Sequence, residues 1–289
     1  MRERLEGLLG AHVVSLEFVQ GRGYTNAGRH RAVLDDGRSF FVKSAVDELS
    51  AGWLRLERIV YGNVEGSFLP ECVAYDEAEG PPVLVLEDLS SAHWPPPWRE
   101  GEVEAVRAAL DVVAATEAPP GLTPIEVWRS DWVGRWREIA EEPAPFLSTG
   151  IASEAWLDEQ LPALEAAAAR APVAAGASLL HLDVRSDNIA LSDRGALLVD
   201  WNWASRGNAL VDLVAWTPSL CIETGMRPEE VVDADGAGEI AALLAGVWGQ
   251  AAGLPPPPTA QPRVRAFQLA QLRLTLPWAC RSLGIAEPG

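Results

Sequence analysis

The sequence predicts an α+β protein with two lobes, a small antiparallel β-sheet with one main helix and a mostly α-helical remainder. The chain has 289 residues, roughly the length of two typical domains. Its first third contains short runs rich in valine and phenylalanine, bounded by turn residues, which is typical of strands. From Glu102 onward, apolar residues recur mainly at helical spacing. We therefore predict an N-terminal lobe at residues 1–90 and a helical C-terminal lobe at residues 91–289.

The N-terminal lobe is expected to begin as an antiparallel meander. The Asp-Asp-Gly sequence at 35–37 is a hairpin signal between two of its strands. Trp53, Leu56 and Val60 lie at helical spacing and predict an amphipathic helix that packs on the sheet. The proline-rich residues 90–98 interrupt secondary structure and predict a linker. The predicted strands lie at 13–19, 29–34, 39–43, 71–77 and 81–90.

The helical lobe is predicted from the 3.6-residue period of its apolar positions. Pro255 to Pro258 form a stiff loop between two of its helices. The predicted helices lie at 102–116, 131–142, 153–171, 237–252 and 263–283, with a further core helix starting at 213–221.

Composition excludes several classes of protein. No apolar run approaches the roughly 18 residues that a membrane span requires, and no signal peptide is recognisable. Three separated cysteines, Cys72, Cys221 and Cys280, fit reduced thiols in a cytoplasmic protein. The net charge of -18 argues against nucleic-acid and membrane partners, and no obligate protein partner is evident. The acidity favours a cationic substrate, although solubility alone also explains an acidic surface.

Lys43 stands out because the other 22 basic residues are arginines. A position that keeps lysine can require a compact ammonium on a thin stem instead of a planar guanidinium. A lysine at a strand edge with its ammonium in water is the alternative.

A glycine-bearing turn lies between the first two predicted strands. Gly21 and Gly23 would let backbone amides approach a phosphate, and Thr25 and Asn26 add side-chain donors. Such a turn also occurs without any ligand.

Residues 181–201 place acidic side chains around apolar runs that predict buried strands. Buried carboxylates are costly unless they are paired or bind a cation. Asn188 and Asp200 offer the hard oxygen atoms that Mg²⁺ binds together with substrate phosphates and water. Asp183 would face the same pocket without binding the metal. The spacing from His181 through Asp183 and Asn188 to Asp200 matches the catalytic loop and metal aspartate of protein kinases.

Together, GRGYTN, Lys43, Glu57 in ERIVY, LVLEDLS, HLDVRSDN and LLVDWNWA resemble the aminoglycoside phosphotransferase and choline kinase group of small-molecule kinases, which have the protein-kinase-like fold. The resemblance implies ATP or GTP with Mg²⁺, bound between the lobes. It implies that Lys43 contacts the phosphates, that Glu57 orients Lys43, and that adenine lies against the backbone around Glu87 to Leu89.

The same resemblance assigns the catalytic loop. It implies Asp183 as the general base, Asn188 and Asp200 as Mg²⁺ ligands, and Asp212 as a buttress of the loop. Arg185 is a candidate for contact with the transferred phosphate or the acceptor, or it pairs with a neighbouring carboxylate.

Other acidic and aromatic residues near this loop have simpler expectations. His181 is expected to be structural, and Asp187 and Asp193 to be solvated turn residues. Trp203 is a candidate for stacking on an acceptor.

Three positions depart from the family pattern or stay open. Leu182 replaces a common glycine, and Asn202 replaces an acidic residue after the Asp-Trp pair. Glu57 is preferred over Glu48 as the partner of Lys43 from the pattern alone.

The function expected from these residues is ATP- and Mg²⁺-dependent transfer of the γ-phosphoryl group to a hydroxyl of a small molecule, such as an aminoglycoside or amino sugar. A protein substrate is not expected, because the chain lacks the activation segment of protein kinases. The alternatives are a nucleotide-binding pseudokinase that acts as a regulatory module and a two-metal phosphoesterase, for which four histidines are few.

Overall fold

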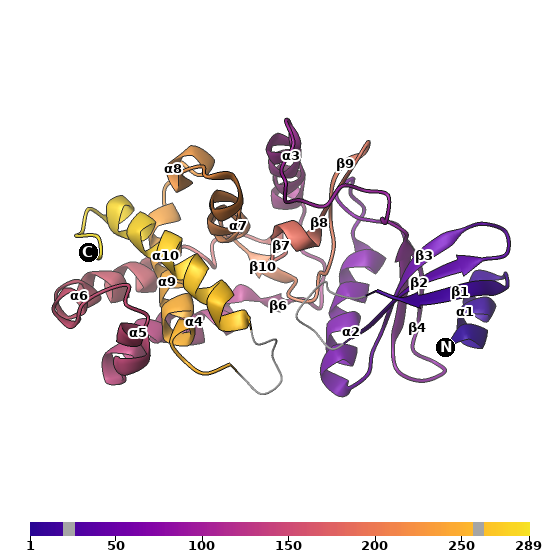
Figure 1. Ribbon diagram of the computed structural model, residues 1–289, viewed down its shortest axis with the longest axis horizontal. Coiled ribbons are helices and arrows are strands. Elements are labelled where there is room, and N and C mark those ends of the chain that lie inside the picture. Colours follow the sequence, from indigo (N-terminus) through magenta and orange to yellow (C-terminus); the bar gives the residue numbers. More distant parts are fainter. Residues whose placement is uncertain (20–26, 257–262) are drawn as a thin grey trace. The chain divides into compact units, whose positions relative to one another are not determined.

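The computed structural model describes residues 1–19, 27–256 and 263–289 (Figure 1). Its contacts group the chain into two compact units. The first joins Met1–Leu122 with Ser186–Ala204, and the second joins Thr123–Arg185 with Ser205–Gly289. The division at residues 90 and 91, expected from the order of the elements, stays a prediction.

The first unit contains an antiparallel five-stranded sheet with the strand order β1-β2-β3-β5-β4 (Figure 1). Strands form at all five predicted positions. They are β1 Val13–Phe18, β2 Gly28–Leu34, β3 Ser39–Ser44, β4 Cys72–Asp76 and β5 Val83–Glu87.

The two faces of this sheet bury different clusters, because side chains alternate between the faces of a strand. Val42 of β3 packs in a cluster with Leu5, from a helix α1 at Arg2–Leu9 that the sequence reasoning missed. On the other face, Leu84 of β5 packs with Leu54, from the predicted helix α2 at Glu48–Asn63. Lys43, next to Val42 in β3, therefore shares the face that α2 covers.

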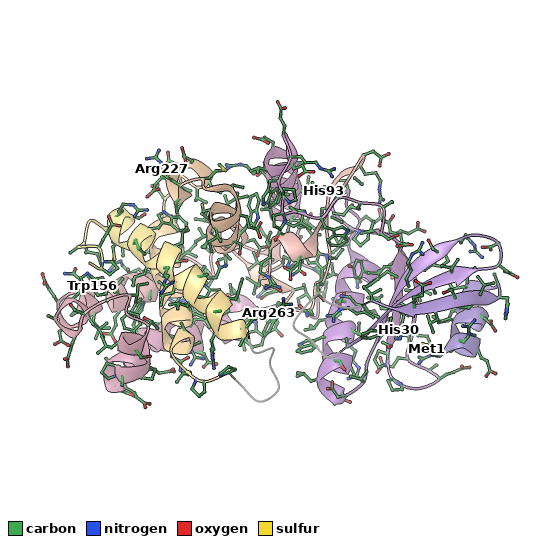
Figure 2. All side chains as sticks on the ribbon, viewed as in Figure 1. Met1, His30, His93, Trp156, Arg227 and Arg263 are labelled. Atoms are coloured by element: carbon green, nitrogen blue, oxygen red, sulfur yellow. The ribbon has the colours of Figure 1, made fainter. Side chains whose placement is uncertain are left out.

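A β-hairpin completes the first unit. It consists of β8, Ile189–Ser192, and β9, Gly195–Leu198, preceded by a short 3₁₀ helix, η1, at Ser186–Asn188. His93, labelled in Figure 2, joins the hairpin through two backbone hydrogen bonds of 2.8 Å with Leu191. The helix α3 at Glu102–Ala115 also contacts β9.

The second unit is mainly helical, and α9 lies at its centre. Most residues of α9 are buried, and it contacts α4, α5, α6, α7 and α10. Trp136 donates to the Ala242 carbonyl oxygen of α9 at 2.8 Å, beside Gly246, where a Cβ atom would come within 2.8 Å of the indole. Trp156 donates to the Ala286 carbonyl oxygen at 3.0 Å (Figure 2). The helices are α4 Ile125–Glu141, α5 Ala144–Ser148, α6 Glu154–Arg170, α7 Leu210–Thr224, α8 Pro228–Val231, α9 Ala237–Ala252 and α10 Val264–Leu283.

A small three-stranded sheet of order β6-β10-β7 belongs to the second unit. Its strands are β6 Thr123–Pro124, β7 Ser178–Leu180 and β10 Ser205–Gly207. With the larger sheet and the helices, it confirms the predicted α+β class. Among the described residues, no helix combines the length and apolarity needed to cross a membrane.

Candidate functional site

Lys43 is held between two carboxylates in the first unit. Its Nζ atom lies 2.8 Å from both carboxylate oxygens of Glu57 and 2.7 Å from Oδ1 of Asp200. The side chain of Lys43 is 5% exposed, that of Glu57 2% and that of Asp200 14%. The alternative of a lysine that extends into water is therefore wrong, and a buried ion cluster takes its place.

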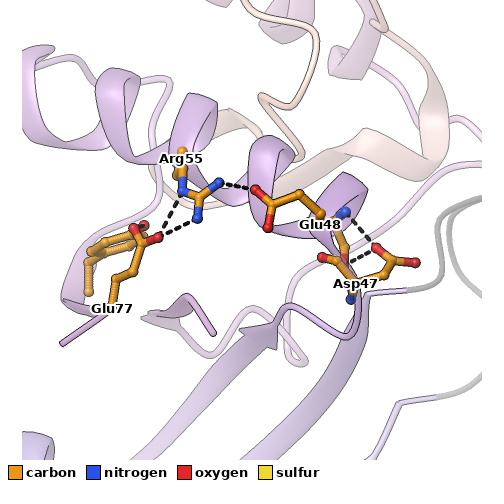
Figure 3. Close-up of polar contacts among 6 residues, drawn as sticks. Asp47, Glu48, Arg55 and Glu77 are labelled. Atoms are coloured by element: carbon orange, nitrogen blue, oxygen red, sulfur yellow. Dashed lines mark hydrogen bonds and ion pairs between the residues drawn. The ribbon is translucent and has the colours of Figure 1, made fainter. Parts of the chain in front are cut away.

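Helix α2 explains why Glu57 is the partner and Glu48 is not. The buried face of α2 includes Ser50, Leu54 and Glu57, which follow the three- and four-residue spacing of one helix face. Glu48 lies on the exposed side, where it pairs with Arg55 at 2.6 Å, as Figure 3 shows.

The start of α2 is fixed by a capping box. The Asp47 carboxylate accepts a hydrogen bond of 2.7 Å from the Ser50 backbone N–H, and the Ser50 hydroxyl accepts one of 3.1 Å from the Asp47 backbone N–H. Such caps satisfy N–H groups that a helix start otherwise leaves unpaired. The cap therefore fixes the residue at which α2 begins.

The electrostatics of the cluster keep Lys43 charged. Burial disfavours its ammonium, but Asp200 and Glu57 outweigh this and raise the pKa of Lys43 above its ordinary value. Burial raises the pKa of Glu57 to about 7, although Lys43 lowers it. Two carboxylates around one ammonium leave an excess negative charge while both are ionised, which favours an additional cation nearby.

The β8–β9 hairpin brings Asn188 and Asp200 to the same end. Ile189 pairs with Leu198, and the next step of the ladder is a hydrogen bond of 3.0 Å from the Val199 N–H to the Asn188 carbonyl oxygen. Asp200 then adopts a left-handed backbone conformation with φ 69°, which aspartate tolerates better than most residues. Sequence positions twelve residues apart are thus neighbours in space.

These groups line a pocket of about 290 Å³ in the first unit. Its lining includes Lys43, Asn188, Asp200, Glu87 and Leu89, all predicted as site residues. The volume lies just below the usual range for small-molecule sites, roughly 300–1,000 Å³.

The pocket lining also includes residues that the sequence reasoning missed, namely Arg29, Arg31, Phe41, Trp94 and Asp187. Asp187 is half-buried in the short helix η1, and Asp193 is exposed in the hairpin turn, as expected. The pairing register of β2 with β3 would have indicated the two arginines. Arg29 pairs with Lys43 and Arg31 with Phe41, and directly paired residues share a face of the sheet.

The segment after β5 is held in place by Asp88. Its Oδ2 atom accepts hydrogen bonds of 2.6 Å from Arg31 and from Ser39, and its Oδ1 atom accepts one of 2.9 Å from the Ser90 N–H. Glu87 lies 2.5 Å from Arg194. The contacts of Asp88 and Glu87 therefore hold the pocket edge at residues 87–89 in place.

The first part of the predicted catalytic loop, residues 181–185, belongs to the second unit. Arg185 pairs with Asp183, with Nε 3.0 Å from Oδ1 and Nη2 3.3 Å from Oδ2, and its guanidinium lies 5.2 Å from the ring centre of Phe267. One of the alternatives for Arg185 was an ion pair with a neighbouring carboxylate, and the structure contains this pair. His181 is buried, and its Nδ1 accepts the Asp183 N–H at 3.2 Å, which fits a structural role.

Asp212 supports this loop through its backbone. The carboxylate accepts hydrogen bonds from the N–H groups of His181 at 2.6 Å and Leu182 at 2.7 Å. Burial raises the pKa of Asp212 to about 6, and the two N–H groups lower it. This contact is the buttress that the family resemblance implies.

Leu182 has a backbone φ of 59°, in the left-handed region. This backbone fits the glycine that the family resemblance implies at this position, because a Cβ atom costs about 1–2 kcal/mol there. We expect Leu182→Gly to be more stable than Leu182→Ala by about 1 kcal/mol. In the middle of a helix or strand the order is the reverse, and alanine is the more stable of the two. Both variants lose the leucine side chain, so urea denaturation of the pair isolates the backbone effect. A Leu182→Ala protein that is the more stable would contradict it.

The remaining candidate residues lie in the glycine-bearing turn and directly after Asp200. Gly21, Gly23, Thr25 and Asn26 lie outside the described residues. Trp203 is 44% exposed and Asn202 is 4% exposed.

The donor set of the pocket fits Mg²⁺. Asn188 and Asp200 supply two oxygen-bearing side chains, and Mg²⁺ usually takes one or two carboxylates and completes its shell with water and phosphates. No cluster of three or more metal-ligating His, Cys, Asp or Glu residues occurs in the part of the chain that the structure describes.

Comparison with known proteins places the chain in a family. The model of the phosphotransferase enzyme family matches residues 21–254. No curated protein sequence matches significantly. The fold is that of a crystal structure of a thermostable mutant of aminoglycoside phosphotransferase APH(4)-Ia with ADP and hygromycin B, at 16% identity, TM-score 0.59 and coverage of 98% of this chain and 97% of that one.

Two further structures share the fold. One is the GDP complex of aminoglycoside 2'-phosphotransferase-IIIa, at 11% identity, TM-score 0.58 and 98% coverage of both chains. The other is a choline/ethanolamine kinase family protein from Mesorhizobium loti, at 16% identity, TM-score 0.58 and coverage of 98% and 96%. The predicted protein-kinase-like fold and the predicted enzyme class, a small-molecule kinase, are confirmed. This chain belongs to the phosphotransferase enzyme family.

Proposed function

We propose that this enzyme transfers the γ-phosphoryl group of ATP, bound with Mg²⁺, to a hydroxyl group of a small molecule. The observation that carries the proposal is the ion cluster of Lys43, Glu57 and Asp200 on the wall of a pocket that Asn188 also lines. A buried ammonium beside two hard oxygen donors suits a metal-bound triphosphate.

The nucleotide is proposed to occupy this pocket. Lys43 then shifts from Asp200 to phosphate oxygens while Glu57 keeps its ammonium in place. Arg29, on the same sheet face as Lys43, adds a second positive charge to the lining. Structures of the same fold contain ADP or GDP, which supports nucleotide use.

Asn188 and Asp200 are the residues that would hold the metal. When bound, Mg²⁺ neutralises charge on phosphate oxygens. Asp200 is already oriented by its hydrogen bond to Lys43, and the Asn188 backbone is fixed by the Val199 N–H. Before nucleotide binds, these contacts hold the Asp200 carboxylate and the Asn188 backbone at the pocket wall.

Asp183 is proposed as the general base. A bond forms between the acceptor oxygen and the γ-phosphorus, the bond from that phosphorus to the β–γ bridging oxygen breaks, and ADP leaves. The hydroxyl proton passes to the Asp183 carboxylate. Arg185, paired with both oxygens of Asp183, is proposed to orient that carboxylate.

The acceptor is proposed to be a cationic small molecule such as an aminoglycoside or amino sugar. The net charge of -18 favours amine-bearing substrates over anionic ones. A structure of the same fold contains hygromycin B.

A panel of acceptors assayed by ADP release tests the proposal. The panel contains aminoglycosides, amino sugars, choline-like amines and neutral sugars, each with and without Mg²⁺, and mass spectrometry detects the phosphorylated product. We expect at least one amine-bearing acceptor to raise ADP release in the presence of Mg²⁺ only. If ADP release is the same with and without every acceptor, and the same with and without Mg²⁺, the proposed reaction is refuted.

Glu57 and Glu48 provide a matched pair for the role of Lys43. Glu57→Gln removes the charge that holds Lys43, and a hydrogen bond to a charged group contributes about 1.5–3 kcal/mol, roughly a 10- to 150-fold effect on kcat/KM. Glu48→Gln removes only an exposed ion pair, so we expect little change. Steady-state kinetics with ATP as the varied substrate measure both. Equal effects of the two substitutions would contradict the assignment.

A further inference from the structure

The backbone carbonyl of Leu89 is fully engaged inside the first unit. Its oxygen accepts one hydrogen bond from the Ala92 N–H at 3.1 Å and a second from the indole Nε1 of Trp94 at 3.2 Å. A carbonyl oxygen has two lone pairs. The Leu89 oxygen therefore has no remaining acceptor site for a ligand.

The N–H of the same residue is available. Within the described part of the chain, the Leu89 N–H donates to no protein group. The neighbouring Ser90 N–H is already bound to the Asp88 carboxylate at 2.9 Å. Leu89 and Trp94 both line the pocket that contains Lys43. At this edge, the backbone of Leu89 thus offers a ligand one donor and no acceptor.

The purine bases differ in what they need from such an edge. Adenine presents N1 as an acceptor, which the Leu89 N–H satisfies. Its N6 amino group is a donor on one side of N1, and the C2–H group on the other side needs no acceptor. Adenine can therefore place C2–H against the engaged Leu89 carbonyl and direct N6 away from it. Guanine presents O6 as an acceptor, followed by N1–H and N2–H as two donors. When O6 accepts from the Leu89 N–H, the next backbone group that could accept from N1–H is the Leu89 carbonyl. A buried donor left without an acceptor is costly.

We propose that the engaged Leu89 carbonyl makes this enzyme select adenine over guanine nucleotides, with Trp94 as the specificity-determining residue. The inference rests on the proposed nucleotide binding in this pocket and adds the choice of base. Trp94 acts by occupying a lone pair that guanine requires. One unpaired donor corresponds to roughly a 10- to 100-fold weaker binding of the guanine nucleotide.

The test compares two non-hydrolysable nucleotides, AMP-PNP and GMP-PNP, each with Mg²⁺. Isothermal titration calorimetry gives their Kd values for the wild-type protein, for Trp94→Phe and for Trp98→Phe. Phenylalanine keeps an aromatic ring at position 94 but lacks the indole N–H, so it frees one lone pair of Leu89. Trp98 is half-buried in the same segment and does not line the pocket, so it is the matched control.

We expect the wild-type protein to bind AMP-PNP about 10-fold or more tightly than GMP-PNP. In Trp94→Phe this ratio should fall several-fold through tighter GMP-PNP binding, and Trp98→Phe should keep the wild-type ratio. Equal wild-type affinities, or a ratio that Trp94→Phe leaves unchanged, would overturn the inference while the proposed function stands. Binding of neither nucleotide would overturn both.

Discussion

Asp200→Ala is expected to lower kcat/KM by roughly 10²- to 10³-fold or more, the effect of removing one group that stabilises transition-state charge. The substitution removes a proposed metal ligand and one of the two carboxylates that hold Lys43. We also expect nucleotide binding to lose its dependence on Mg²⁺. ADP release and calorimetric titration measure the two effects.

The folded state of Asp200→Ala should remain intact, which separates a catalytic defect from unfolding. Removing Asp200 leaves Lys43 paired with Glu57, one positive and one negative charge, so the buried cluster loses its excess negative charge. Alanine is less favourable than aspartate at the left-handed backbone of position 200, which offsets this gain. The ligand-free variant is therefore expected to melt within a few degrees of the wild-type temperature. Asp193→Ala, in the exposed turn of the β8–β9 hairpin, is the matched control and should keep wild-type activity. Wild-type turnover in Asp200→Ala would refute the role of this carboxylate.

Asp183→Asn is expected to lower kcat by roughly 10²- to 10⁴-fold, the usual contribution of a general base. Asparagine keeps the shape of the side chain but does not accept a proton. The KM for ATP should change little, because Asp183 is not assigned to nucleotide binding. Asp235→Asn, at an exposed position of the same unit, should leave both constants unchanged. A rise in the KM for ATP at constant kcat would contradict the assignment of Asp183 as the base.

Much of the fold could be predicted because long elements carry a clear period. The helix at 237–252 was predicted with the bounds that α9 has, and each of the three meander strands differs by one residue from its predicted range. The two-residue strand β6 pairs with β10 across about 80 residues of chain, and no local pattern marks such a pair. Helix α1 does carry a local pattern. Leu5 and Leu9 lie four residues apart on one helix face, and Gly10 follows as the C-cap with φ 68°.

The site could be predicted where a single residue type was informative. Lys43 was identified because it is the only lysine in the sequence, and the buried face of α2 would have decided between Glu57 and Glu48. Arg29 and Trp94 were missed because their place in the pocket depends on strand register and on the path of the chain after β5. Those depend on contacts between distant segments, which a local sequence window does not contain.

The most direct test of the account is the binding of AMP-PNP to the wild-type protein and to Lys43→Met, with and without Mg²⁺. Methionine fills the space of the lysine stem without its charge. The account predicts that the wild-type protein binds AMP-PNP tightly only with Mg²⁺, and that Lys43→Met weakens this binding by about 10-fold or more, as the loss of a charged hydrogen bond would. Equal affinities of the two folded proteins, or wild-type binding that Mg²⁺ does not change, would contradict it.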